Sequence, residues 1–384
     1  MFEIKEKNKT NGLRKSNSTF ILIFILSFLL IFFFIIFSSC TSSNLNSVTK
    51  INDKIYPNSF YIDVGITDSI IELNTKTTIP FSINTEKYKD SDFYEELAYN
   101  ESKKLLQNES INIHYQLFVP ENKPKGKFLL VHGLAGSTFT YHFLAPMLVN
   151  AGYIVIAIDL LNFGYSERIK LKLNSNCFAD LIYQFLVKLE DRYSQELFND
   201  CPSGWQIVGH SMSGRILTVF AYKYGKIIKD LILISPAFFG SRNYPILLKI
   251  PPISFFVSLY INSTLKRENF ANLLKKVYLR PPEDYEIESY LKPLLIPNTI
   301  QNILYMLDTP EDPRFNPPDI LRKIELPILL IWGDKDSIVP LDKSSKFIES
   351  IKNKKLIEVE NAGHNSMETH VEIVFDNIMK YINR

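Results

Sequence analysis

The sequence is poor in the residues that build disulfide frameworks and metal centres. It has three cysteines in 384 residues and no C-x-x-C pair, so neither a zinc ribbon nor a thioredoxin-type motif is expected. An amphipathic stretch separates Cys177 from Cys201, and as a helix it would be about 30 Å long. A disulfide requires Cα atoms within roughly 7 Å, so we expect two unpaired cysteines. No cluster of His, Asp and Glu has metal-ligand spacing and no glycine pattern fits a dinucleotide site, which predicts neither metal nor cofactor.

A large excess of charge of one sign is also lacking. The formal net charge is +2, with 22% charged and 46% hydrophobic residues, a composition typical of a globular chain that can bury a core. Residues 1–15 alone carry a net charge of +3, so the rest of the chain is near −1 by subtraction from the total of +2. This balance gives no reason to expect nucleic acid as a partner, because that function usually demands a clustered basic face.

One long apolar run is present, and it follows the basic N-terminus. Residues 20–37 are apolar except for Ser27, and as a helix they would span roughly 27 Å, close to the hydrocarbon thickness of a bilayer. Small residues and Cys40 come next. This order is typical of a secretory signal. Residues 1–39 are therefore predicted to be a signal peptide or a membrane anchor, with the remainder held at the membrane outside the cytoplasm if the basic end stays inside.

The small residues directly before Cys40 resemble the lipobox of bacterial lipoproteins, although Phe37 stands where leucine is commonest. The resemblance implies that Cys40 becomes the lipidated first residue of the mature chain. A retained transmembrane anchor is the alternative, because the apolar run is long for a signal core. In both cases the polar residues 40–57 would form a tether between the membrane and the fold.

From residue 111 onward, apolar runs of strand length alternate with longer helical patterns. This alternation indicates βαβ units and an α/β fold with a mostly parallel sheet flanked by helices, over residues 111–238 and 326–384. Strands are predicted at residues 111–119, 127–131, 153–159, 205–208, 231–235, 327–332 and 356–360. Helices are predicted at residues 143–150, 178–197, 215–224, 343–351 and 371–382.

Two regions do not follow this alternation. Residues 239–325 contain no comparable strand, many prolines and scattered aromatic side chains, and we predict a helical insertion there. Residues 58–110 precede the core as an N-terminal extension to which the sequence assigns no function. Within it, residues 60–64 and 70–73 resemble strands and residues 93–106 resemble a helix.

Three of the predicted strands end in side chains that could act together. They run into the sequences GHSMSG (residues 209–214), GDKD (333–336) and NAGH (361–364). Because parallel strands deliver their carboxyl ends to the same edge of a sheet, Ser211, an aspartate and His364 can converge there. A serine hydroxyl is a weak nucleophile until a base takes its proton, and the imidazole that does so needs an acid to fix its tautomer.

Two further loops complete the pattern, HGLAGS at residues 132–137 and DLLNFGYS at residues 159–166. Together with the three strand ends, they resemble the α/β-hydrolase superfamily, in the form of an esterase- or lipase-like serine hydrolase, over roughly residues 111–384. Two positions depart from the family pattern. Ser213 stands where the G-x-S-x-G elbow has its last glycine, and Asn162 replaces the first glycine of the D-x-x-G-x-G-x-S loop.

The resemblance implies a role for each residue at the strand ends. Ser211 would be the nucleophile and His364 its general base, with an aspartate to orient the base. Of the two aspartates in GDKD we predict Asp336, because it stands three residues past Gly333, the position that the family uses. Asp334 is expected to close the turn instead.

The resemblance also implies an oxyanion hole and a cap. The tetrahedral intermediate of acyl transfer needs backbone donors for its oxyanion. Met212 directly follows the nucleophile and Leu134 follows His-Gly in an HGxxGS loop, so their N–H groups are expected to bind the oxyanion. Residues 239–325 fall where the family inserts its cap, and residues 159–166 would have a mainly structural role. A serine at position 211 argues against the superfamily's haloalkane dehalogenases and epoxide hydrolases, which use aspartate there.

Three functions remain open from the sequence. The first is a membrane-anchored serine hydrolase that cleaves small carboxylic esters through an acyl-enzyme, with the aromatic cap favouring an apolar group in the substrate. The second is a carbon–carbon bond or lactone hydrolase with the same three residues. The third is a non-catalytic relative that binds a ligand. The presence of a suitable residue at every triad position argues against this third function.

Overall fold

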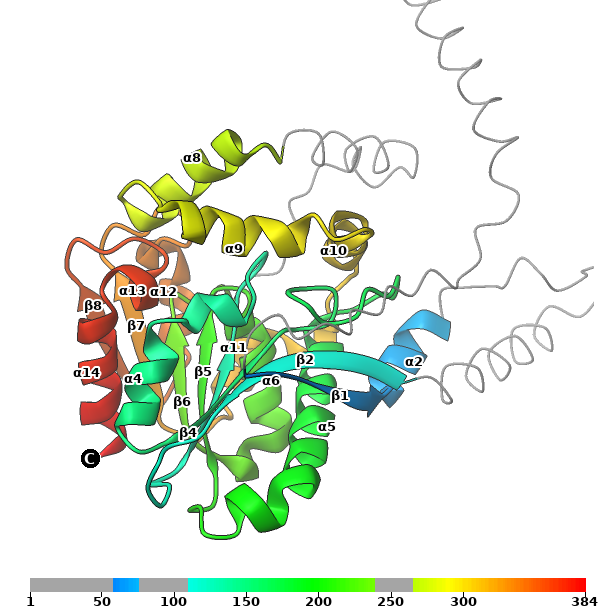
Figure 1. Cartoon of the computed structure of the whole chain (residues 1–384), viewed down its shortest axis with the longest axis vertical. Helices are drawn as coiled ribbons and strands as arrows, with labels where there is room; N and C mark the ends of the chain where they lie inside the picture. Colours follow the sequence, from blue (N-terminus) through cyan, green and yellow to red (C-terminus); the bar gives the residue numbers. More distant parts are fainter. Residues whose placement is uncertain (1–57, 76–109, 239–264) are drawn as a thin grey trace, which may run out of the picture. The chain divides into compact units, whose positions relative to one another are not determined.

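The computed structural model of the protein describes residues 58–75, 110–238 and 265–384 (Figure 1). The expected signal or anchor, Cys40, the tether and the helix predicted at residues 93–106 lie outside these ranges. Within them, no helix combines the length and the hydrophobicity that a membrane span requires.

A central sheet organises the described residues. Its strands lie in the order β1-β2-β4-β3-β5-β6-β7-β8. β2 pairs antiparallel with β1 and with β4, and every other neighbouring pair is parallel, which confirms the predicted mostly parallel sheet. The strands are β1 (Ser59–Gly65), β2 (Ser110–Phe118), β3 (Lys127–Val131), β4 (Ile154–Ile158), β5 (Trp205–His210), β6 (Ile228–Ile234), β7 (Ile328–Gly333) and β8 (Lys354–Val359).

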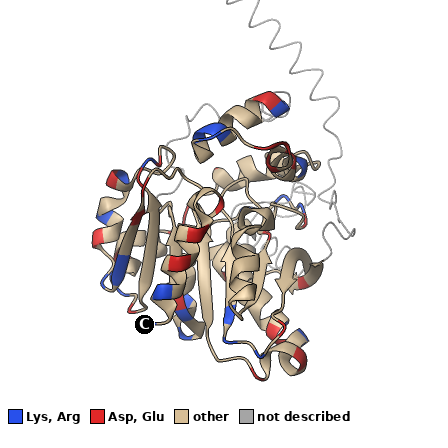
Figure 2. Ribbon diagram, turned by 60° about the vertical axis from the view of Figure 1, so that its left-hand side comes forward, with Lys and Arg blue, Asp and Glu red and all other residues tan. Residues whose placement is uncertain are grey.

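Helices cover both faces of this sheet (Figure 1). Successive strand side chains point to opposite faces, so each buried strand supplies two cores. In β3, Leu129 belongs to the core under α5 and α6, whereas Leu130 belongs to the core under α4 and α14. Figure 2 shows the charged residues mainly on the peripheral helices and loops, while the middle strands are largely uncharged. These helices are α4 (Leu144–Asn150), α5 (Ser175–Tyr193), α6 (Ser213–Tyr224) and α14 (Val371–Ile382).

Helices also fill the described part of the predicted insertion, residues 265–325. In Figure 1, α8 to α10 lie beyond the carboxyl ends of the strands, whereas α11 packs against α6 and α12. The helices of this half of the chain are α8 (Arg267–Tyr278), α9 (Asp284–Leu294), α10 (Thr299–Leu307), α11 (Pro317–Leu321), α12 (Leu341–Glu349) and α13 (Ser366–Thr369). We refer to α8, α9 and α10 as the cap helices.

The segment that precedes the core is part of the sheet. β1 pairs with β2 along its whole length, which confirms the strand expected at residues 60–64. The strand expected at residues 70–73 is wrong, because this segment is helix α2 (Asp68–Thr75). The hydroxyl of Thr67 accepts the N–H of Ile70 at 3.4 Å, and Asp68 lies in the first turn, where a negative charge favours a helix.

Candidate active site

Ser211 lies at a sharp turn between β5 and α6. Its φ of 51° is in the left-handed region, which a non-glycine residue adopts only when the surroundings enforce it. The flanking glycines explain how strand and helix come so close. A methyl group at Gly209 would lie 2.3 Å from Leu217 Cδ1, and one at Gly214 would lie 2.3 Å from Pro236 Cβ. Gly214 therefore leaves no room for a side chain, whereas a side chain at Gly209 would require Leu217 to move, and the turn presents Ser211 at its tip.

Ser213, the residue that departs from the elbow pattern, has a specific partner. Its side chain is fully buried, and its hydroxyl donates a hydrogen bond to the carbonyl oxygen of His132 at the end of β3. His132 begins the loop that contains Leu134. The hydroxyl thus connects the elbow to the neighbouring loop, which a glycine could not do.

The structure brings Ser211, His364 and Asp336 together. His364 Nε2 lies 2.9 Å from Ser211 Oγ, and His364 Nδ1 lies 2.7 Å from Asp336 Oδ2. The second carboxylate oxygen of Asp336 accepts the N–H groups of Ile338 and Val339, both at 2.9 Å. Those bonds fix the carboxylate with one oxygen left for the imidazole.

The loops that carry Asp336 and His364 contact each other closely. A methyl group at Gly333 would lie 2.2 Å from the carbonyl oxygen of Gly363, so only glycine permits this approach. Asp334 is exposed, and its N–H donates to Val359, which places it in the turn as predicted.

His210 holds the backbone of the His364 loop through a hydrogen bond. Its Nε2–H donates to the carbonyl oxygen of His364 at 3.1 Å. Burial, and then the neighbouring His364, hold the pKa of His210 well below its usual value, so its ring is neutral at neutral pH. His210 is therefore a fixed donor that holds the loop backbone.

The loop after β3 lies directly against Ser211. A methyl group at Gly133 would lie 2.9 Å from Ser211 Cβ. Ala135 has a φ of 58°, and the N–H of Gly136 bonds back to the carbonyl of Gly133 at 3.1 Å, which closes a tight turn around Leu134. Among the described residues, no acceptor takes the main-chain N–H of Leu134 or Met212. Leu134 and Met212 line the same cavity as Ser211.

Ser211 opens into a cavity of about 450 Å³. This volume falls within the usual range for small-molecule sites. Most of its lining is apolar and comes from the core, with Met306 and Leu307 contributed by cap helix α10. The described residues that line it are Leu134, Leu173, Asn174, Ser175, Phe178, Ser211, Met212, Arg215, Ile216, Ala237, Met306, Leu307, Thr309, Glu311, Ile338 and Val339.

The aromatic residues of the cap helices α8, α9 and α10 are not among the described residues that line this cavity. Phe270, Tyr278 and Tyr290 are buried and pack in the core. Phe178, from α5, is the aromatic side chain that the described lining contains. Among the described residues, the apolar character of the site therefore comes from aliphatic and methionine side chains and Phe178.

One end of the cavity is polar, a feature that the sequence did not reveal. Glu311 Oε1 lies 3.3 Å from Arg215 Nε, and both Ser175 Oγ and Ser175 N–H donate to the same carboxylate. Arg215 also donates to the carbonyl of Phe238 at 3.2 Å. The position of Arg215, four residues after Ser211 at the start of a helix, is the signal that could have indicated it.

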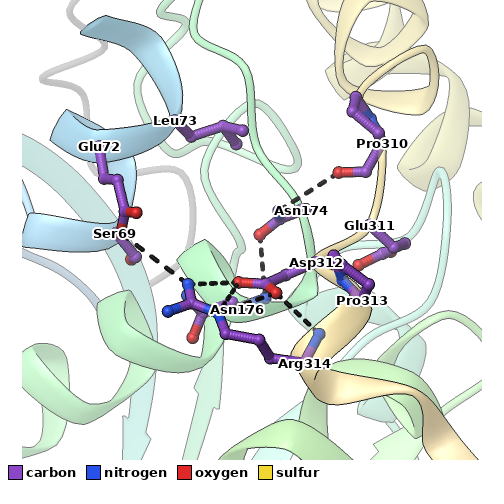
Figure 3. Close-up of a pocket in the computed structure, with 10 residues that line it drawn as sticks. All are labelled: Ser69, Glu72, Leu73, Asn174, Asn176, Pro310, Glu311, Asp312, Pro313 and Arg314. Carbon is purple, nitrogen blue, oxygen red and sulfur yellow. Dashed lines mark hydrogen bonds and ion pairs between the residues drawn. The ribbon is translucent and has the colours of Figure 1, made fainter. Parts of the chain in front are cut away.

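A second cavity, of about 520 Å³, lies behind this polar end and shares Asn174 and Glu311 with the first (Figure 3). It separates α2 from residues 310–314. Figure 3 shows Arg314 paired with Asp312, and Arg314 Nη2 lies 3.9 Å from Glu72 across the cavity. Ser211 is not part of its lining, so the candidate chemistry belongs to the first cavity.

The remaining histidines do not reach Ser211. His114 is buried between Asp159 at 2.6 Å and Ser59 at 3.0 Å. His142 stacks on Phe139, with ring centroids 4.1 Å apart, and is absent from the lining of the Ser211 cavity. They are therefore packing and hydrogen-bonding residues of the fold.

The loop at residues 159–166 has the structural role expected of it. Asp159 accepts the N–H groups of Thr138 at 2.5 Å and Tyr165 at 2.8 Å, so it ties two loops together. Asn162, in place of a glycine, adopts a φ of 71°. Asparagine is one of the few side chains that tolerate this region, which explains the substitution.

The fold and this arrangement define a hydrolase of the α/β type. The model of the α/β-hydrolase fold family matches residues 127–371, and the chain belongs to that family.

Known proteins of this type resemble the chain over most of its length. An uncharacterized hydrolase of Bacillus subtilis (strain 168) is 27% identical over 276 residues, which are 71% of this chain and 95% of that protein. Lipase 3 of Moraxella sp. (strain TA144) is 29% identical over 259 residues, 66% of this chain and 75% of the lipase. The structure of a 2-hydroxy-6-oxo-6-phenylhexa-2,4-dienoate hydrolase from Rhodococcus sp. strain RHA1 shares the fold, with a TM-score of 0.57, 16% identity and coverage of 71% of this chain and 95% of that one.

Proposed function

We propose that the chain is a serine hydrolase that cleaves carboxylic esters through an acyl-enzyme. The observation that carries the proposal is the continuous contact from Ser211 Oγ through His364 to Asp336, at 2.9 and 2.7 Å, with the serine on a strained turn. The similarity to a lipase at 29% identity supports an ester as the substrate.

Each residue has one task in this mechanism. Ser211 Oγ attacks the ester carbonyl carbon while His364 Nε2 takes the hydroxyl proton, and Asp336 stabilises the imidazolium. The N–H groups of Leu134 and Met212 stabilise the oxyanion of the tetrahedral intermediate. His364 then returns the proton to the departing alcohol. Water, activated by the same imidazole, hydrolyses the acyl-enzyme and releases the acid.

The cavity restricts the substrates that this mechanism would accept. About 450 Å³ of mostly aliphatic lining favours an acyl or alcohol group of moderate length, and the Arg215–Glu311 pair places polar groups at one end. The same three residues would also serve a carbon–carbon bond or lactone hydrolase. A series of aryl esters with acyl chains of increasing length tests the ester assignment, because an ester hydrolase should turn over at least one member.

Covalent labelling tests the proposal directly. A fluorophosphonate probe should label the full-length protein, and Ser211→Ala should abolish both labelling and ester hydrolysis. Asp336→Asn should lower kcat about 10⁴-fold by favouring the wrong tautomer of His364. Asp334→Asn is the matched control, since its carboxyl is exposed, and should stay close to wild type. A protein that resists the probe, or an Asp334→Asn variant as impaired as Asp336→Asn, contradicts the assignment.

We also propose that this enzyme is held at a membrane, outside the cytoplasm, either by a lipid on Cys40 after residues 1–39 are removed or by residues 1–39 retained as an anchor. The support is the sequence alone: a basic start, an apolar run of bilayer length and small residues before the cysteine.

A further inference from the structure

A buried carboxyl group that the mechanism does not use lies next to the candidate site. Glu368 belongs to α13, four residues after His364, and its side chain has no exposed surface. Its Oε1 accepts a hydrogen bond from the hydroxyl of Tyr278 at 3.0 Å, and its Oε2 accepts one from Tyr290 at 2.9 Å. Asn365, the residue after His364, donates its side-chain N–H to the same Oε2.

These partners come from different parts of the molecule. Tyr278 is the last residue of cap helix α8, and Tyr290 lies in cap helix α9. Both tyrosines are buried, so their hydroxyl groups have to be satisfied inside the protein. Glu368 therefore joins two cap helices to the segment that directly follows His364.

A main-chain contact makes the same connection on the other side of His364. The N–H of His364 donates to the carbonyl of Val277 in α8 at 3.0 Å. A methyl group at Gly363 would lie 2.3 Å from that carbonyl oxygen, so the loop and the helix end touch at a glycine. The backbone of His364 is thus bonded to the cap helix whose last residue, Tyr278, binds Glu368.

We propose that Glu368 is a positioning residue that fastens cap helices α8 and α9 to the loop carrying His364, and thereby keeps the imidazole in line with Ser211. The proposal rests on the function proposed above for His364. It predicts that loosening the carboxyl group displaces the cap helices and the histidine together.

The environment of Glu368 favours its protonated form. The nearest basic atom is His142 Nδ1 at 3.8 Å, and that atom bonds instead to the carbonyl of Phe139 at 2.8 Å. Burial raises the pKa of Glu368 to about 8, an effect that its three hydrogen bonds only partly oppose. The titratable and charged groups around it are Tyr141, His142, Tyr278, Arg280, Tyr285, Glu286 and Tyr290.

Three substitutions in the full-length protein test this role. Glu368→Gln keeps a neutral hydrogen-bonding group of the same shape, whereas Glu368→Met removes the hydrogen bonds. The double variant Tyr278→Phe/Tyr290→Phe removes the same bonds from the cap side and keeps the aromatic packing. Glu372→Gln, at an exposed glutamate of α14, is the control.

Two measurements are made on each variant: amide hydrogen exchange over residues 265–307 and 361–370, and ester hydrolysis as a function of pH. Glu368→Met and the double variant should exchange faster in both segments and lose about 10- to 100-fold in kcat, since small misplacements of catalytic groups have effects of this size. Glu368→Gln should keep kcat close to the wild-type value. Wild type should lose activity reversibly above about pH 8, and Glu368→Gln should not.

Unchanged exchange in Glu368→Met and the double variant would overturn the proposal. So would a Glu368→Gln variant that is as slow as Glu368→Met, or one that keeps the alkaline loss of activity. Hydrogen exchange does not depend on catalytic activity, so the two proposals can fail separately. A wild-type protein that resists the fluorophosphonate probe refutes the proposed function. The exchange rates still show whether Glu368 holds the cap helices to the His364 loop.

Discussion

Ser213 illustrates how a departure from a family motif can create a contact. The elbow tolerates it because the position needs only a small side chain, whereas Gly214 contacts Pro236 too closely for any side chain. The hydroxyl then bonds to the carbonyl of His132, in the loop that contains Leu134. The two backbone donors proposed for the oxyanion, Leu134 and Met212, lie on the two segments that this bond connects.

Ser213→Ala should therefore affect both stability and rate. Loss of a buried hydrogen bond to the main chain should lower the free energy of unfolding by about 1 kcal/mol. Movement of the loop should lower kcat several-fold with little change in KM, because the oxyanion forms only after binding. Urea unfolding and steady-state ester hydrolysis measure the two effects.

Ser344→Ala provides the matched comparison for that variant. Its hydroxyl is equally buried but has no hydrogen-bond partner among the described residues. Removing this hydroxyl should leave kcat unchanged and should change the free energy of unfolding only slightly. If both alanine variants behave alike, the bond to His132 has no function beyond packing.

The sequence was sufficient to predict which residues meet at the site, but not what holds them. Ser211, Asp336 and His364 each follow a buried apolar run, and the geometry of a parallel sheet brings such strand ends together. The contacts of Val277 and Tyr278 with the His364 segment depend on how the cap helices dock. That docking joins residues about 90 positions apart, for which no local pattern exists.

At the level of helices and strands, the predictions succeeded where the apolar pattern is clear. β3 and helix α14 have the predicted bounds, since a fully buried strand and a strongly amphipathic helix leave clear apolar patterns. The segment at residues 70–73 resembles a strand when its four residues are taken alone. The residues that start helix α2, Thr67 and Asp68, precede these four. The hydrogen bond from the N–H of Ile70 to the hydroxyl of Thr67 favours the helix.

The contact between the cap helices and the core should make stability depend on pH. The pKa of Glu368 is raised from an ordinary 4.5 to about 8 in the folded protein. The folded state therefore holds this proton more tightly than the unfolded state, and the associated stability is complete below about pH 4.5 and is lost as pH rises toward 8. The loss should approach about 1.4 kcal/mol per pH unit within that window.

Urea unfolding of the full-length protein at pH 5, 6, 7 and 8 measures this dependence. Wild type should lose stability with rising pH more steeply than Glu368→Gln, which has no proton to release. Parallel profiles for the two proteins would mean that Glu368 is ionised in the folded state across this range.

At the scale of the whole molecule, charge and hydrophobicity are divided unevenly along the chain. The N-terminal residues carry the basic charge and the one run of bilayer length, whereas the described core has its apolar side chains inside. A mostly aliphatic cavity beside Ser211 would suit substrates that partition into lipid. Attachment at a membrane would then bring such substrates to the enzyme at a high local concentration.

Metabolic labelling with a fatty-acid analogue tests how the chain is attached. In bacterial cells that express the full-length protein, wild type should take up the label and sediment with membranes, because Cys40 follows a lipobox-like sequence. Cys40→Ala should lose the label, and Cys201→Ala, at a free cysteine of the folded core, should keep it. Sedimentation with membranes without label would identify residues 20–37 as a retained anchor, since about 27 Å of apolar helix is sufficient to span the bilayer core. A soluble, unlabelled wild-type protein would refute both forms of attachment.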